Sequence, residues 1–419
     1  AAALPACAGR SQSAQWACGG WWAAQHEKEK KLPSSHNRHA QTAIKLVVTG
    51  LALGGVGWSA MAQTPKAQTP KAQTVASGLQ HPWAVAFLPE GRFLVTERPG
   101  RMRVVEPDGK LQPPLQGLPE VMAGGQGGLL DVITDADFAR NRTVYFCFSE
   151  PGKGTSNSTA LARARLSDDS KRLTDVKVIF SQQPKYSSSL HFGCRIVERR
   201  VDGQPDGTLF MTLGDRFSRR DDAQTLNNHH GKVIRVGKNG SVPKDNPFVG
   251  QAGALPEIWS YGHRNGQGAT WGPDGQLWMH EHGAQGGDEI NLPQPGRNYG
   301  WPQISHGVNY GGSPVGTGKS AAPGMEQPLH HWTPSIAPSG MAFLTSDRYG
   351  PAWQGNLFVG SLKFQYLNRI ELKDGKVVAE HKLLEDVGQR MRDVRQGPDG
   401  LLYVVTDSPN GRLIRVLPQ

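Results

Sequence analysis

Short hydrophobic runs alternate with tight turns along most of the chain. In the first of these units, the apolar run 84–88 is followed by Pro89-Glu90-Gly91 and then by a second apolar run, 92–96. Proline at the second position of a turn, with glycine after it, reverses a chain sharply. The pattern therefore predicts two antiparallel strands joined by a tight turn.

The same unit recurs five more times along the sequence. A Pro-Asp-Gly turn returns at 205–207, 273–275 and 398–400, each time before an apolar run. Two further copies, at 128–148 and 341–359, have longer turns. Most copies end in another apolar stretch with an arginine at its centre, at Arg103, Arg235, Arg369 and Arg415.

Each predicted unit is a small antiparallel sheet that cannot bury both of its faces alone. Packing six such sheets around a common axis buries these faces and leaves only short edges. We therefore expect an all-β fold, a six-bladed β-propeller of four-stranded antiparallel blades, formed by residues 75–419. A two-sheet sandwich is the alternative, but it accommodates six turn-matched units poorly.

The residues before this domain have a different character. The apolar run 44–58 ends in Ala60-Met61-Ala62, which fits a secretory signal with its cleavage site. We interpret residues 1–62 as a leader and secretory signal segment, of which 1–40 resemble an over-extended reading frame, and expect a periplasmic or secreted protein. A retained anchor is the alternative, but the run is short and glycine-rich for a bilayer span. Residues 63–74 repeat Gln-Thr-Pro-Lys-Ala, which predicts a disordered linker.

Charge and cysteine content narrow the picture further. Lys and Arg outnumber Asp and Glu by 46 to 36. The basic residues are scattered rather than gathered in a stripe, so we expect no nucleic-acid partner, whereas an anionic small ligand is compatible with the excess. Cys147 lies in an apolar run and is interpreted as a core thiol. A disulfide with Cys194 is the alternative if the compartment is oxidising.

Polar residues in the loops beside the predicted strands are candidates for chemistry. His191 precedes the third repeat, and Asp215 follows a later strand, from which a carboxylate could orient and tune the histidine. A structural, hydrogen-bonded histidine is the alternative. The segment 261–268 crowds hydrogen-bond donors between glycines, which suits close approach of a ligand to the backbone.

Two further segments carry charge of one sign. Arg390 and Arg392 lie two residues apart, so they point to the same side of an extended segment. With Lys363 aimed into the same channel, they would repel one another unless an anion such as a carboxylate lay between them. Surface charge is the alternative. The acidic, glycine-rich segment 281–291 offers the oxygen ligands that calcium prefers.

Together these segments resemble the soluble aldose sugar dehydrogenases that depend on pyrroloquinoline quinone (PQQ), relatives of soluble quinoprotein glucose dehydrogenase. The resemblance covers residues 75–417. It rests on motifs found in order: GGQGGLLD (124–131), LHFG (190–193), LGD (213–215), GHRN (262–265), GDEIN (287–291), NYGWP (298–302), IAPS (336–339), SLK (361–363) and RMRDV (390–394).

The resemblance implies PQQ and calcium as cofactors. It implies that His191 is the catalytic base, that Asp215 is its partner carboxylate, and that Arg264 polarises the quinone carbonyl. The residues implied to hold PQQ are Gln126, Asn265, Ser335, Lys363, Arg390 and Arg392. The residues implied to hold calcium are Gly283 and Ala284, through backbone carbonyls, for an ion that bridges to PQQ, and Glu289 and Tyr299 for a second, structural ion.

The sequence departs from the family pattern in three places. Ser335 replaces a threonine and Ala284 replaces a proline, and both changes keep the required oxygen atom. Cys194 and the segment 197–203 interrupt the third repeat just after His191, where the family runs directly into its turn. We expect this insertion to bulge a strand; a sequencing error is the alternative.

The implied reaction is oxidation of the anomeric hydroxyl of an aldose to a lactone. His191 takes the hydroxyl proton, hydride passes to the quinone, and an external acceptor removes the electrons. A calcium-dependent sugar lactonase on a similar propeller is the first alternative, but it has no use for a cationic cage. A non-catalytic propeller that binds a partner or a glycan is the second. No stable membrane insertion is expected of the domain.

Overall fold

The computed structural model describes residues 69–418. The predicted leader, the signal segment and residues 63–68 of the predicted linker lie outside this range. No helix among the described residues combines the length and the apolar character needed to cross a membrane.

The described chain is almost entirely β-structure. The first strands are β1 (Lys71–Leu79), β2 (Pro82–Phe87), β3 (Phe93–Glu97), β4 (Arg101–Val105), β5 (Leu129–Thr134), β6 (Thr143–Pro151), β7 (Asn157–Leu166), β8 (Leu173–Ser181), β9 (Gly193–Val201), β10 (Gln204–Leu213), β11 (Lys232–Gly237) and β12 (Ile258–Tyr261). The others are β13 (Gly266–Trp271), β14 (Leu277–Glu281), β15 (Asp288–Asn291), β16 (His330–Trp332), β17 (Pro338–Phe343), β18 (Leu357–Ser361), β19 (Leu367–Lys373), β20 (Lys376–Leu383), β21 (Arg390–Gln396), β22 (Leu402–Asp407) and β23 (Gly411–Leu417). The helical elements are short: η1 (Pro89–Gly91), α2 (Phe138–Asn141), η2 (Arg220–Gln224) and η3 (Glu385–Val387).

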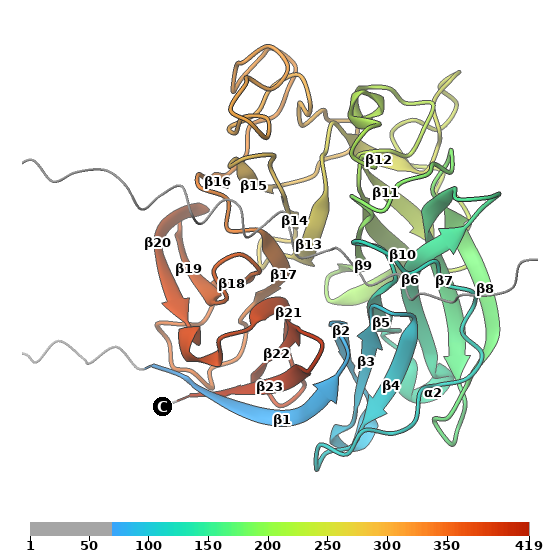
Figure 1. The fold of residues 1–419 in the computed structure, drawn as a ribbon, viewed down its shortest axis with the longest axis vertical. Helices are drawn as coiled ribbons and strands as arrows, with labels where there is room; N and C mark the ends of the chain where they lie inside the picture. Colours follow the sequence, from blue (N-terminus) through green and yellow to red (C-terminus); the bar gives the residue numbers. More distant parts are fainter. Residues whose placement is uncertain (1–68, 419) are drawn as a thin grey trace, which may run out of the picture. The chain divides into compact units, whose positions relative to one another are not determined.

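The strands form six antiparallel sheets whose innermost strands surround a common centre (Figure 1). Five sheets have four strands, and the sheet β2-β3-β4 has three. In the segment that follows β4, only isolated bridges form, such as that between Val105 and Leu111. The predicted six-bladed propeller is confirmed, with the difference that its first blade has three strands.

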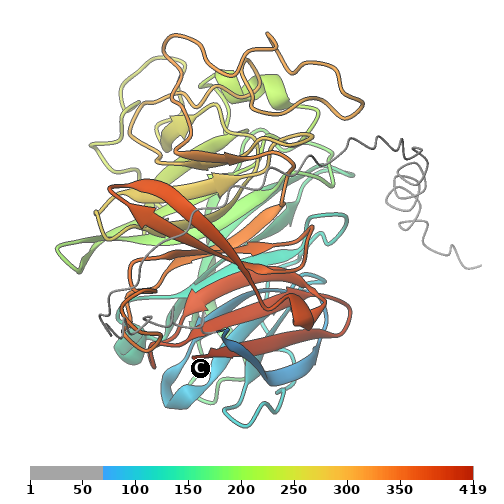
Figure 2. The ribbon, with the colours of Figure 1, turned by 90° about the vertical axis from the view of Figure 1, so that its left-hand side faces the viewer.

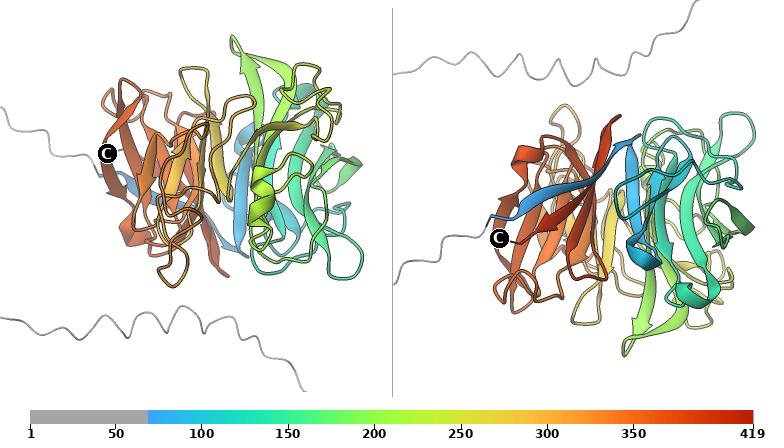
Figure 3. Two further views of the ribbon diagram at one scale, coloured as in Figure 1. Left: turned by 90° about the horizontal axis from the view of Figure 1, so that it is seen from above. Right: turned by 90° about the horizontal axis from the view of Figure 1, so that it is seen from below.

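The ring is closed by strands from the two ends of the described chain. Strand β1 pairs with β23, from Lys71 opposite Leu417 to Leu79 opposite Gly411, and the two strands lie side by side in Figure 3. Pairing with β1 covers the edge of β23, which would otherwise be exposed. Residues 71–74, which we expected in the linker, therefore belong to the closing strand.

Three of the four predicted Pro-Asp-Gly or Pro-Glu-Gly turns lie between strands, at 89–91, 273–275 and 398–400. The fourth is wrong, because residues 205–207 lie inside β10 and the hairpin turns at 202–203. The inserted residues lengthen β9, and the register shift between Pro205 and Leu209 absorbs them at the end of the hairpin remote from His191. The expected bulge is present directly after His191, where β9 has one extra residue between Gly193 and Ile196, and a second irregularity lies on β10.

The core lies between neighbouring blades. Leu94, Phe146 and Met211 belong to one cluster that spans the first three blades, and Val95, Phe358 and Val405 belong to another. A network of charged side chains joins the innermost strands of three blades: Arg195 pairs with Asp131 and Asp393, both at 3.0 Å, and Arg395 pairs with the same two acids.

Candidate active site

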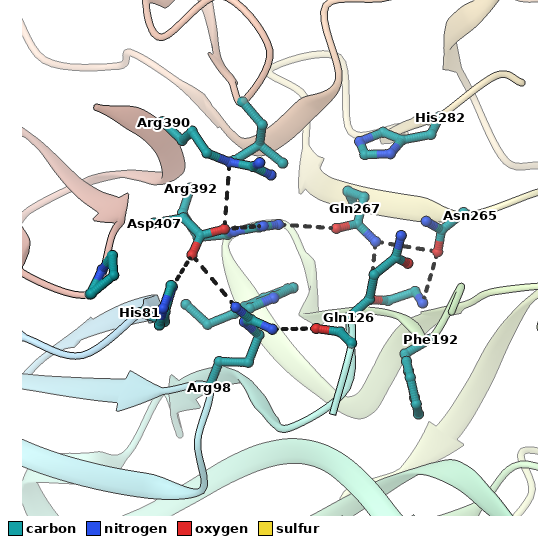
Figure 4. A pocket seen from close by; sticks show the side chains of 15 residues that line it. His81, Arg98, Gln126, Phe192, Asn265, Gln267, His282, Arg390, Arg392 and Asp407 are labelled. Atoms are coloured by element: carbon teal, nitrogen blue, oxygen red, sulfur yellow. Dashed lines mark hydrogen bonds and ion pairs between the residues drawn. The ribbon is translucent and has the colours of Figure 1, made fainter. Parts of the chain in front are cut away.

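The ends of strands define one mouth of the central channel. Innermost strands begin there, and the second strands of the blades end there, because neighbouring strands are antiparallel. A cavity of about 460 Å³ lies at this mouth (Figure 4). The residues that line it are His81, Trp83, Arg98, Gly125, Gln126, Phe192, Gly193, Asn265, Gln267, His282, Leu362, Arg390, Arg392, Asp407 and Pro409.

One wall of the cavity is a cluster of positive side chains around a buried carboxylate. Asp407 Oδ2 accepts a hydrogen bond from Arg392 Nη2 at 2.8 Å and lies 3.7 Å from Arg390 Nε. Its Oδ1 accepts from His81 Nδ1 at 2.8 Å and lies 4.0 Å from Arg98 Nη2. Burial alone would raise the pKa of Asp407, but the arginines and His81 hold it far below its usual range. Asp407 is therefore the resident counter-ion of three arginines.

His191 and Asp215 form a buried pair beside the cavity. The Nδ1–H of His191 donates to Asp215 Oδ1 at 2.6 Å, and Asp215 Oδ2 accepts from Trp301 Nε1 at 2.7 Å. The other ring nitrogen of His191, Nε2, has no hydrogen-bond partner among residues 69–418. A histidine that is fixed through Nδ1 presents an unprotonated Nε2, so this nitrogen is available to accept a proton.

The electrostatic surroundings keep His191 neutral. Burial and the charge of Arg264 lower its pKa below the usual 6.5, against the opposing effect of Asp215. Burial raises the pKa of Asp215, but its interaction with His191, the charge of Arg264 and the hydrogen bond from Phe217 N–H outweigh it, and the net shift is downward. An ionised Asp215 can therefore hold a neutral imidazole.

The backbone around His191 is tightly held. Its φ is 49°, in the left-handed region that side chains disfavour. Its N–H donates to Gln126 Oε1 at 2.8 Å, and Asn265 Oδ1 accepts from the N–H of Gly193 at 3.0 Å. These two residues, expected to hold a cofactor, therefore also position the histidine.

A disulfide holds the strand that follows His191. Cys147 on β6 is bonded to Cys194 on β9, with 6.5 Å between their Cα atoms. The prediction that Cys147 is a free core thiol is wrong, because β9 brings Cys194 next to it across the interface between two blades. The bond links the second blade to the third, and Cys194 lies three residues after His191 in the sequence.

Two other histidines near the site, His263 and His282, differ in how their ring nitrogens are hydrogen-bonded. His263 uses both ring nitrogens, with Nδ1 2.9 Å from Glu281 Oε1 and Nε2 2.8 Å from Ser260 Oγ. His282 lines the cavity, and its Nε2–H donates to Pro338 O at 2.6 Å. Removal from water lowers the pKa of His282 to about 4.

Of the remaining residues expected at the site, Arg264 lines a cavity, whereas Ser335 and Lys363 do not. Arg264 stacks on Trp301, with its guanidinium carbon 5.1 Å from the ring centroid, and donates to His282 O at 3.1 Å. It lines a second, very small cavity together with Gly283, Glu289 and Tyr299. Ser335 and Lys363 line neither cavity. Lys363 is exposed, and its ammonium group lies over Phe364 at 4.9 Å.

The loop expected to bind calcium is anchored by Asp288. Its Oδ1 accepts from Gly283 N–H at 2.9 Å, and its Oδ2 accepts from Ser335 Oγ–H at 2.7 Å and Ala337 N–H at 2.9 Å. Asp288 therefore shapes the loop that carries the main-chain oxygens of Gly283 and Ala284. The Ser335 hydroxyl is engaged by this carboxylate.

Two neighbouring carboxylates share one donor in the small cavity. Asn291 Nδ2 donates to Glu281 Oε1 at 3.0 Å and to Glu289 Oε2 at 3.1 Å. Removal from water and the charge of Glu281 raise the pKa of Glu289 to about 8. The Tyr299 hydroxyl donates to Leu292 O and accepts from Gln294 N–H at 2.9 Å. Within residues 69–418 no group of three or more His, Cys, Asp or Glu side chains could hold a metal ion.

Comparison with known proteins identifies the family. Residues 79–415 match the glucose/sorbosone dehydrogenase family. The chain belongs to this family. It is 46% identical to the aldose sugar dehydrogenase YliI of Escherichia coli, over 81% of this chain and 91% of that protein. A solved glucose dehydrogenase is 49% identical and has a TM-score of 0.80, over 84% of this chain and all of the other. The PQQ-bound aldose sugar dehydrogenase of Streptomyces coelicolor is 28% identical and has a TM-score of 0.68, over 83% and 98%.

This dehydrogenase is therefore an oxidoreductase that acts on a sugar CH–OH group. Five residues that line the cavity were not predicted from the sequence: His81, Trp83, Arg98, Asp407 and Pro409. The repeat contained a signal for two of them. All three lie at the end of the second strand of a blade: Asp215 two residues after β10, Arg98 directly after β3, and Asp407 as the last residue of β22.

Proposed function

We propose that the enzyme oxidises the anomeric hydroxyl of an aldose to a lactone, with PQQ as electron acceptor and calcium as accessory ion. The observation that carries the proposal is the His191–Asp215 pair beside a cavity whose other wall holds three arginines. The PQQ-bound relative from Streptomyces coelicolor supports the choice of cofactor.

Three side chains take part in the proposed proton and hydride transfer: His191, Asp215 and Arg264. His191 Nε2 accepts the proton of the anomeric hydroxyl, and Asp215 stabilises the imidazolium that results. Arg264 supplies positive charge next to this pair, where it can stabilise negative charge on the acceptor oxygen. When bound, PQQ supplies the carbon that takes the hydride from the sugar.

The cavity residues fit an anion with several carboxylates. Arg98 and Arg392 each keep a buried Nε–H that has no hydrogen-bond partner in the described part of the chain. A buried donor without a partner is costly, and ligand carboxylate oxygens would satisfy it. Gln126, Asn265 and Arg390 complete this PQQ-binding set. The proposed roles of Ser335 and Lys363 rest on the family resemblance.

We propose that calcium binds in two places. The carbonyl oxygens of Gly283 and Ala284 would hold the ion next to the cofactor, where it supplies Lewis acidity. Glu289 and the Tyr299 carbonyl would hold the structural ion, because two neighbouring carboxylates favour either a proton or a cation. Calorimetric titration with calcium should show that the Glu289→Gln variant binds one ion fewer per chain than the unmodified protein.

The decisive experiment follows the quinone spectrum of protein reconstituted with PQQ and calcium. Glucose should reduce the bound quinone in the unmodified enzyme. In His191→Gln the cofactor should bind but stay oxidised, and turnover should fall by about 10²–10⁴, the usual contribution of a general base. Reduction at a near-normal rate in this variant would exclude His191 and point to His282.

The same preparation separates the alternatives. A lactonase would open an added sugar lactone without PQQ, and a non-catalytic propeller would bind without reducing the quinone. We also propose a periplasmic or secreted location and an external electron acceptor. The disulfide supports this location, because such bonds persist in oxidising compartments.

A further inference from the structure

An exposed aromatic side chain lies next to His191. Phe217 follows Asp215 by two residues, in the loop between β10 and η2, and is 44% exposed. Its ring centroid lies 5.2 Å from that of His191, and the two planes meet at 80°. Phenylalanine normally buries most of its surface, so an exposed ring beside the proposed base calls for an explanation.

The backbone at this position is held in an unfavourable conformation. Arg216 and Phe217 have φ values of 60° and 66°, in the left-handed region that residues with a side chain avoid. The N–H of Phe217 donates to Asp215 Oδ1 at 2.8 Å. Such strain persists where the surroundings enforce it, and it concentrates at functional sites.

The two neighbours point in opposite directions. The Arg216 side chain is fully buried, and its guanidinium lies 3.7 Å from the centroid of Phe192 and donates to Ser188 O at 2.6 Å. The inward anchor of Arg216 directs Phe217 outward. The loop leads into η2, whose first residue, Arg220, donates from Nη1 to Asn309 Oδ1 at 3.2 Å in the long β15–β16 connection, at the top of Figure 2. Phe217 therefore presents a fixed surface.

We propose that Phe217 is the platform on which the sugar ring stacks, an inference that rests on the proposed aldose oxidation. One face of an aldopyranose carries several C–H groups, polarised by the neighbouring oxygens. The face of an aromatic ring is negative and attracts such groups. A pyranose against Phe217 has its anomeric hydroxyl within reach of His191, because the two side chains are in contact. Phe217 thus selects cyclic aldoses with a continuous C–H face.

The test separates sugar binding from catalysis. Phe217→Leu keeps an apolar side chain but removes the aromatic face, Phe217→Tyr restores that face, and Val378→Ala, at a 57% exposed position on β20, is the control. We expect Phe217→Leu to raise KM for glucose about 2- to 10-fold, more than it lowers kcat. Phe217→Tyr should return KM to near its original value. The same factor should appear in the Kd of glucose, measured by calorimetry in a His191→Gln background.

The outcomes are distinct. An unchanged KM and Kd in Phe217→Leu would overturn the proposal. A lower kcat or a shifted pH profile with unchanged KM would also overturn it, because Phe217 would then position His191 instead of binding sugar. If no aldose reduces the quinone of the unmodified enzyme, the proposed oxidation fails. The calorimetric comparison still tests the platform in that event.

Discussion

Arg390 and Arg392 lie two residues apart on β21, yet we expect their removal to have different effects on stability. The Arg390 side chain is 45% exposed and lies 3.7 Å from Asp407, whereas the Arg392 side chain is 10% exposed and donates to Asp407 at 2.8 Å. Exposed ion pairs contribute about 0–1 kcal/mol, and breaking a buried pair costs about 3–5 kcal/mol. Asp407 keeps His81 and Arg98 as partners, so we expect a loss of about 1–3 kcal/mol for Arg392→Ala.

Both changes should weaken cofactor binding. A hydrogen bond to a charged group contributes about 1.5–3 kcal/mol, so each variant should raise the Kd of PQQ by about 10- to 150-fold. Titration of apoprotein with PQQ measures this Kd, and urea unfolding without PQQ measures stability. Arg140→Ala, with a side chain 80% exposed, is the control and should change neither quantity. Equal destabilisation by Arg390→Ala and Arg392→Ala, or an unchanged Kd in both, would refute the reasoning.

Three further predictions follow from the site and the closure of the ring. Burial lowers the pKa of His191, and its neutral form is the base. We therefore expect kcat/KM to rise with pH through a midpoint below 6.5. A midpoint above 6.5 in the pH profile would contradict this. Replacing Cys147 and Cys194 by serine should lower the free energy of unfolding by about 2–4 kcal/mol, and an unchanged urea midpoint would show that the disulfide does not stabilise the blade interface. A chain that begins at residue 65 should fold, whereas one that begins at residue 80 lacks β1 and should unfold at a lower temperature in a calorimetric scan; equal unfolding temperatures would mean that the ring closes without β1.

The repeat was readable from the sequence because it depends on local rules. Alternating apolar runs and turn residues determine each hairpin, and six similar hairpins can bury their faces only by packing side by side. The turn at 205–207 was misjudged because a turn sequence does not determine register. The paired length of β9 decided where that hairpin reverses.

The candidate site was only partly readable, because its residues come from strand ends far apart in the chain. The sequence alone determined the residue types: a histidine with a possible carboxylate partner, and clustered cations that needed an anion. Only the tertiary structure decided the partners. It placed Asp407 among three arginines, Cys194 next to Cys147, and the Phe217 ring beside His191. Closing six blades into a ring brings these groups within contact distance, and local sequence patterns carry no information about such long-range distances.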